Sequence, residues 1–294
     1  MKRPAAYVGS FIISILLVFA LIASFLAITV NSVNADKLVA AADDKGLASM
    51  VENELERYFN ERKNTTGIPA NVYMDSIDEE YLSNIIQFKI NSGFSILSGD
   101  VGDEFDMSNI ELENNISEFF SEYAESIGYE KDNNYDVKLM TAQKSAYTII
   151  EEYCDVYKFG AMERHGVLKK AAPLYQKLSL IIALCIIASA ALAIILFVIN
   201  IKEIKNLAYW IGTSAVVSGA MGAIPCIYLL ASDYFSAFTI KQPQIFTAYT
   251  TLMKDLTSKF MTFSIASVII GIVLFIVCAI MSKFIRKSES QTES

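Results

Sequence analysis

Histidine is almost missing from this 294-residue sequence, which contains only His165. Because one imidazole cannot form a cluster, a metal site built on several histidines is excluded. No triad of nucleophile, histidine and acid can be drawn without this residue. A single histidine near Arg164, Lys169 and Lys170 is more typical of a solvated side chain than of a general base. The sequence therefore predicts a protein that is not an enzyme, with no catalytic, cofactor-binding or metal-binding residues.

Cysteine is also scarce, and its four positions exclude a disulfide-rich fold. Cys185, Cys226 and Cys278 lie inside long apolar runs, and only Cys154 lies in the polar part of the chain. That polar part, residues 31–177, is long enough to bury a core without a disulfide. The sequence also contains no GxxxxGK[ST] pattern, so a nucleotide site of that kind is not expected.

Charge is absent from four runs, residues 7–30, 178–199, 207–231 and 261–282, which contain no Asp, Glu, Lys, Arg or His. If each run forms a helix, with a rise of about 1.5 Å per residue, it is long enough to cross a hydrocarbon core of about 30 Å. The sequence therefore predicts four transmembrane helices and a lipid bilayer as partner. The first run exceeds the usual apolar segment of a signal peptide, so we expect an uncleaved signal anchor.

The same lack of charge bears on transport. Ion and proton pathways need ionisable side chains at membrane depth, and none of the four runs supplies one. An independent pump or ion-coupled carrier is therefore disfavoured. A pore formed by several copies of the chain remains open.

Basic residues cluster before the first run, in the link 200–206 and after the fourth run. They are Lys2, Arg3, Lys202, Lys205, Lys283, Arg286 and Lys287. Cytoplasmic loops of membrane proteins are enriched in Lys and Arg. We therefore expect a protein of the cell membrane with residues 1–6, the link 200–206 and the polar tail 283–294 on the cytoplasmic side. Residues 31–177 and 232–260 would then lie outside. The Ser- and Glu-rich tail is expected to be disordered.

Residues 31–177 are acidic, with 27 Asp and Glu against 14 Lys and Arg, a net charge of about −13. Such a domain repels nucleic acid, which is excluded as its partner. A local cluster of Asp100, Asp103, Glu104 and Asp106 resembles a calcium loop in composition. Its spacing does not match that of an EF-hand, so we interpret it as a polar turn.

Apolar residues recur every three or four positions in the stretches 38–59, 82–97, 112–127 and 140–161, which predicts four amphipathic helices. Gly67 is expected at the end of the first helix and Ser108 at the start of the third. No long alternating run indicates a strand. The expected fold is all-α, with an extracytoplasmic four-helix bundle inserted between the first and second spans.

The second outer segment carries an apolar stripe at helical spacing. Its members are Ile245, Phe246, Tyr249, Leu252, Met253, Leu256 and Phe260. This helix could lie on the membrane surface, pack on the bundle, or extend the fourth span outward, and the last is the simplest interpretation. We predict these seven residues as a candidate interaction surface.

Small residues mark one face of the third span. Ser214, Ser218 and Gly222 follow at four-residue steps, and Gly219 lies on the neighbouring row. Small residues at this spacing let helices approach closely in lipid. They indicate either an interface with another chain or packing against the second and fourth spans of the same chain. We expect packing within the same chain.

The order of elements is similar to that of FtsX-type permeases in layout, but the seven-residue link leaves no room for the cytoplasmic element those proteins present to an ATPase. No family is assigned. The leading hypothesis is a non-enzymatic multi-pass protein whose outer domain binds a protein or another ligand, in a scaffold or accessory role. The alternative is a sensing or permease-like subunit that transmits changes in this domain to a partner. Either a partner protein or a homo-oligomer is expected.

Overall fold

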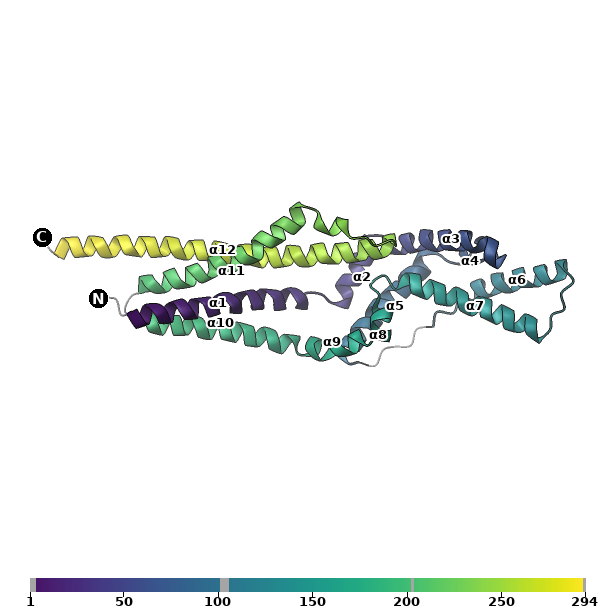
Figure 1. The fold of residues 1–294 in the computed structure, drawn as a ribbon, viewed down its shortest axis with the longest axis horizontal. Helices are drawn as coiled ribbons and strands as arrows, with labels where there is room; N and C mark the ends of the chain where they lie inside the picture. Colours follow the sequence, from purple (N-terminus) through teal and green to yellow (C-terminus); the bar gives the residue numbers. More distant parts are fainter. Residues whose placement is uncertain (1–3, 101–105, 202–203, 293–294) are drawn as a thin grey trace. The chain divides into compact units, whose positions relative to one another are not determined.

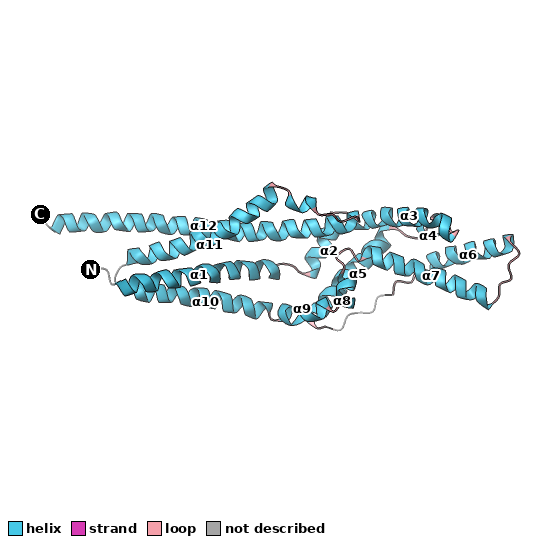
Figure 2. Ribbon diagram, in the orientation of Figure 1, coloured by secondary structure: helices cyan, strands magenta, loops and turns pink. Residues whose placement is uncertain are grey.

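The computed structural model describes residues 4–100, 106–201 and 204–292. Within these ranges all regular structure is helical and no residue lies in a strand (Figure 2). The predicted all-α class is therefore confirmed. Asp103 and Glu104 of the acidic turn lie outside the described residues.

The chain divides into two compact units. The span unit comprises Met1–Val33, Lys177–Phe238 and Met253–Ser294, and the acidic unit comprises Asn34–Gln176 and Thr239–Leu252. The acidic unit thus contains nearly the whole segment 31–177, together with a short stretch that precedes the fourth apolar run.

Four helices of the span unit are long and apolar enough to cross a membrane, as predicted. These are α1 (Pro4–Asn31), α10 (Leu178–Asn200), α11 (Ile204–Ala231) and α12 (Pro243–Thr292). The 3-10 helix η1 (Tyr234–Ala237) follows α11. The chain is therefore a multi-pass membrane protein by the length and composition of its helices.

Helix α1 packs along α10 and α11, and these three helices lie side by side in Figure 1. Their shared core contains Leu17, Leu196 and Trp210, which are nearly inaccessible to solvent. Trp210 meets the ring of Tyr7 edge-on, with the ring centroids 5.2 Å apart. By contrast, α10 leaves side chains such as Leu184 and Ile187 exposed, as expected for a surface that faces lipid.

Helix α12 is longer than the fourth span alone. It begins at Pro243, which is tolerated in the first turn because its missing N–H would have no helical partner there. The helix continues to Thr292, through the tail for which no structure was expected. The sequence from residue 283 onward contains no Gly or Pro that would end a helix.

The acidic unit contains eight helices in its described residues besides the start of α12. They are α2 (Ala35–Asp44), α3 (Leu47–Thr66), α4 (Asn71–Met74), α5 (Glu79–Ser98), α6 (Ile110–Ser126), α7 (Asn133–Cys154), α8 (Phe159–Arg164) and α9 (Val167–Gln176). Helix α5 contacts α2, α3, α7, α8 and α9 (Figure 1). The predicted bundle of four helices is not confirmed, because the unit is arranged around this central helix.

The core of the acidic unit follows from the apolar stripes of its helices. Leu82, Ile86 and Ile90 on α5 are fully buried, as are Leu55 on α3 and Ile150 on α7. Burial of each such side chain contributes about 1.5–3 kcal/mol. The stripes predicted from the sequence therefore form this core, although the first predicted helix is divided in two and the fourth ends at Cys154.

Two left-handed residues mark two of the four helices that the sequence had not predicted. Gly46 has a φ of +60° and separates α2 from α3, which the sequence had predicted as one helix. Lys158 has a φ of +56° and precedes α8, where the fourth predicted helix had been expected to continue. A residue in this conformation interrupts the helical hydrogen-bond pattern and redirects the chain.

Candidate ligand groove

A cavity of about 330 Å³ opens between α3 and α7 in the acidic unit. Its first wall comes from α3 and the segment that follows it, and the residues are Tyr58, Phe59, Arg62, Thr66, Ile68 and Tyr73. Its second wall comes from α7, and the residues are Val137, Lys138, Thr141, Ala142, Ser145, Ala146 and Ile149. We call this cavity the groove.

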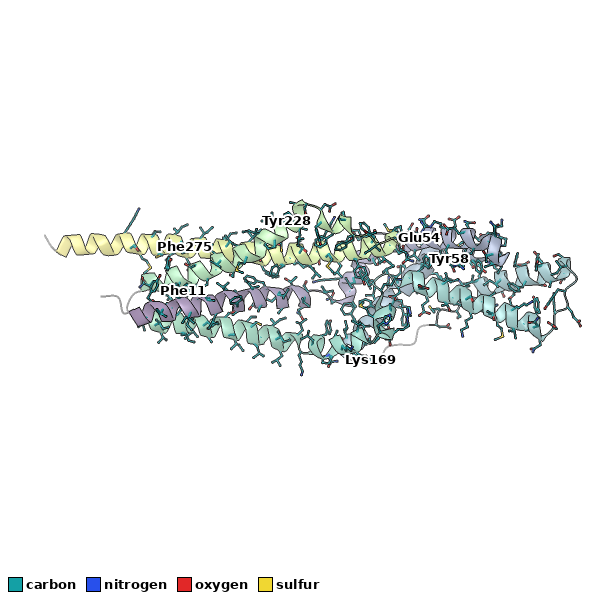
Figure 3. The ribbon with its side chains drawn as sticks, viewed as in Figure 1. Phe11, Glu54, Tyr58, Lys169, Tyr228 and Phe275 are labelled. Carbon is teal, nitrogen blue, oxygen red and sulfur yellow. The ribbon has the colours of Figure 1, made fainter. Side chains whose placement is uncertain are left out.

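The floor of the groove is aromatic. The rings of Phe59 and Tyr73 are stacked, with centroids 4.1 Å apart and planes 15° from parallel. Both side chains are buried. Tyr58, labelled on α3 in Figure 3, meets the edge of Phe59 at 5.5 Å between centroids. Burial raises the pKa of Tyr73 to about 12, so its phenol is neutral near pH 7.

The turn after α3 brings this floor together. Helix α3 ends at Thr66, and Gly67 follows it with a φ of +76°; the N–H of Gly67 donates to the carbonyl oxygen of Lys63. The predicted role of Gly67 at this helix end is confirmed. The chain then reverses through Ile68 and places Tyr73, on α4, against the ring of Phe59.

Small side chains on α7 leave the space open. Ser145 and Ala146 follow Ala142 at steps of three and four, so both lie on the same face of the helix as Ala142. Opposite them, α3 presents the rings of Tyr58 and Phe59. Rings of this size facing small residues leave a hollow, whereas a Leu or Phe at residue 145 would fill it.

The charged residues of the groove are both basic. Arg62 and Lys138 line it, and no Asp or Glu among the described residues does. The guanidinium of Arg62 lies 5.2 Å from the ring centroid of Tyr58, and the ammonium of Lys138 lies 4.9 Å from that of Tyr129. Neither cation forms an ion pair with a carboxylate of the residues that the structure describes.

Two other buried polar groups of the acidic unit lie away from the groove lining. Asp155 is 6% exposed, and one of its carboxylate oxygens accepts the N–H of Gly160 at 3.0 Å. Its other oxygen, and both amide atoms of the buried Gln244, have no partner among the described residues. Unpaired buried groups of this kind cost about 1–3 kcal/mol each.

Groups with nucleophilic or metal-binding chemistry do not gather in the described part of the chain. His165 is exposed at the end of α8. Cys154 is fully buried, and burial raises the pKa of its thiol well above the usual value. No group of three His, Cys, Asp or Glu residues in the described ranges is arranged to hold a metal ion.

The predicted interaction surface divides between the two units. Ile245, Phe246, Tyr249 and Leu252 belong to the acidic unit, and Met253, Leu256 and Phe260 belong to the span unit. Ile245 is buried and the other six are partly buried. Tyr249 donates a hydrogen bond from its hydroxyl to the carbonyl oxygen of Tyr157 at 2.7 Å. The acidic-unit end of the stripe is therefore occupied in part by contacts within its own unit.

The small residues of the third span contact other helices of the same chain. Ser214 shares a hydrogen bond of 2.7 Å with Ser14 on α1, and Ser218 shares one of 3.3 Å with Ser267 on α12. A Cβ atom at Gly219 or at Gly222 would overlap Ser264 of α12. The structure thus places all four residues at contacts with the first and fourth spans.

Sequence reasoning did not find the groove. The one available signal was the set of small residues on the otherwise amphipathic stretch 140–161, and it does not reveal which helix lies opposite. Comparison of the chain with protein-family models, with curated proteins and with solved structures finds no match.

Proposed function

We propose that this chain is a non-enzymatic multi-pass membrane protein whose acidic unit lies outside the cytoplasm and binds a ligand in the groove. The observation that carries the proposal is the groove itself, which combines a buried aromatic floor with an opening to solvent. Its volume of about 330 Å³ lies at the lower end of the range for small-molecule sites. The role is that of a binding or accessory protein. A partner protein or a second copy of the chain would interact with its ligand-bound form.

The orientation rests on the distribution of basic residues. Lys2 and Arg3, the link 200–206 and the basic residues after the fourth span mark the cytoplasmic side of a cell membrane. Both termini then lie inside, and the acidic unit lies outside. The net charge of about −13 in residues 31–177 is compatible with a location outside the cytoplasm. Long segments are translocated largely regardless of their charge, and Asp and Glu contribute little to orientation.

The non-enzymatic assignment is supported by the chemistry of the acidic unit. The one histidine is solvated, and the one thiol of this unit is buried and protonated at neutral pH. The groove contains cations, hydroxyls and apolar groups, but no carboxylate or imidazole to transfer a proton. This lining is suited to holding a molecule rather than to converting it.

The proposal is tested by filling the groove. Ser145 and Thr148 are both exposed on α7, but only Ser145 lines the groove. The full-length protein in nanodiscs is titrated with neutral fluorophenylacetamide, and the fluorine NMR line width is measured. Broadening is expected for the wild type and for Thr148→Trp, and its loss for Ser145→Trp. Equal broadening in Ser145→Trp, or none in the wild type, would refute the groove as a binding site.

A second candidate function, a sensing or permease-like subunit, is favoured by the continuity of α12. Residues 243–252 of this helix belong to the acidic unit and residues 253–292 to the span unit, with no break between them. A continuous helix is a rigid element that carries coupling between distant sites, so a displacement at one end of α12 would move the other. Ligand binding would then alter the arrangement of the spans.

Spin labels on two spans distinguish this candidate from simple binding. Leu26 on α1 and Leu184 on α10 are exposed, so labelled cysteines at these positions will not disturb the core. The distance between the labels is measured with and without saturating fluorophenylacetamide. A change in the distance between the labels would support transmission from the groove to the spans. An unchanged distance at full occupancy would contradict the sensing function and leave the binding function in place.

A further inference from the structure

We infer that the groove takes a small amphiphile with one anionic head and an apolar, ring-sized body; this inference rests on the proposed binding function and adds the chemical class of the ligand. Thirteen residues of the described part of the chain line the groove, and Arg62 and Lys138 are the charged ones among them. The surrounding segment 31–177 has about twice as many acidic as basic residues. A lining with two bases and no acid therefore departs from the composition of its unit.

The two cations are held by rings rather than by carboxylates. Arg62 lies over Tyr58, and Lys138 lies over Tyr129 with its ammonium 3.4 Å from the phenol oxygen. The ring covers only one side of the cation, so the N–H groups on the other side remain available to a ligand. An incoming anion then gains a charge-assisted bond without first displacing an acidic side chain.

The apolar part of the ligand is defined by the rest of the lining. Phe59, Tyr73 and Ile68 are buried on one wall, and Val137 and Ile149 face them from α7. Flat stacked rings favour a flat or short aliphatic body, which gains by leaving water. The lining thus combines two cations with apolar and aromatic side chains, the two kinds of group that an anionic amphiphile requires.

The size of the groove decides between a small molecule and a protein segment. A volume of about 330 Å³ suits a compact ligand, whereas a specific protein interface buries roughly 800 Å² on each partner. The cations come from two different helices, α3 and α7, and both line the same cavity. A single head group that reaches both would bridge these helices.

The test compares two probes that differ only in charge. Fluorophenylacetate and its neutral amide have the same shape, and both are titrated into the full-length protein in nanodiscs by fluorine NMR. We expect the carboxylate to bind at least about tenfold more tightly than the amide. Arg62→Gln and Lys138→Gln should each lower the affinity for the carboxylate and leave that for the amide unchanged.

Matched controls carry the same loss of charge on the same helices. Lys63 on α3 and Lys144 on α7 are exposed and do not line the groove, so Lys63→Gln and Lys144→Gln should bind both probes like the wild type. If the two probes bind equally, and Ser145→Trp abolishes both, the anionic class is wrong and the binding site stands. If Ser145→Trp changes neither probe, the site itself is wrong.

Discussion

At the scale of single residues, Ser264 explains why two positions of α11 have no side chain. A Cβ atom at Gly219 would overlap the carbonyl oxygen of Ser264, and one at Gly222 would overlap its hydroxyl. In lipid there is no hydrophobic force between helices, so close packing and hydroxyl bonds hold them together. The bond between Ser218 and Ser267 lies in the same contact.

We therefore predict that Gly219→Ala lowers the stability of the full-length protein by about 1–3 kcal/mol, because the added methyl meets backbone. The measurement is thermal unfolding in detergent. Gly9→Ala on α1 is the control, since the nearest atom to its Cβ is the Ile199 Cδ1 at 3.8 Å, an ordinary contact. An unfolding temperature for Gly219→Ala equal to that of Gly9→Ala would contradict the close packing of α11 on α12.

The buried phenol of Tyr73 gives the acidic unit a defined response to alkali. Burial, with a smaller effect of Tyr58, raises its pKa from 10.0 to about 12. Because the folded value lies above the unfolded one, this contribution to stability is complete below pH 10 and disappears as the pH rises to about 12. Tyr157 has the same raised pKa of about 12 through burial.

We expect the free energy of unfolding to fall between about pH 10 and pH 12, and to fall less steeply in Tyr73→Phe. The replacement keeps the ring that stacks on Phe59 and removes the ionisable hydroxyl. Denaturant unfolding followed by circular dichroism at several pH values measures the slope. Tyr157 keeps its own contribution, so the slope should be reduced rather than lost; identical slopes would disprove the assignment.

At the scale of elements, helix boundaries are decided by single polar residues and single backbone angles. The sequence predicted Ser108 as the start of the third helix, but Asn109 occupies that position. Its side-chain oxygen accepts the N–H of Leu112 at 3.0 Å, and its amide also donates to the carbonyl oxygen of Ser76 at 2.8 Å. The prediction was wrong by one residue because this second, non-local bond favours Asn over Ser.

Gly46 separates α2 from α3 with a φ of +60°, and no atom lies within 4 Å of a Cβ built there. We predict that Gly46→Ala costs about 1–2 kcal/mol of stability through the backbone alone. Gly46→Asn should cost less, since Asn tolerates the left-handed region. Unfolding curves of the two variants measure the difference, and equal losses would mean that contacts rather than the backbone angle set the cost.

At the scale of the whole molecule, the uneven distribution of charge predicts how the chain crosses the membrane. Ser126 on α6 and Lys283 at the end of the fourth apolar run are both exposed. We expect Ser126→Cys to react with a membrane-impermeant maleimide in intact cells, and Lys283→Cys only after permeabilisation. The native Cys154 is buried and should not contribute. The reverse pattern would invert the proposed orientation.

The sequence by itself determined the helical class, the four apolar helices and the stripes that form the core of the acidic unit. These features are local, because they depend on periodicity and composition within one segment. The residues of the stripes, such as Leu55, Leu82 and Ile150, are buried as the pattern predicts.

Only the tertiary structure decided which surfaces meet. Phe59 and Ala146 line one groove although nearly ninety residues separate them in the sequence. Periodicity within one segment carries no information about such non-local pairs. The same holds for Ser264 against Gly219, and for Tyr249, whose hydroxyl bonds to Tyr157. Each contact depends on shape and hydrogen-bonding groups brought together by packing, which no single segment encodes.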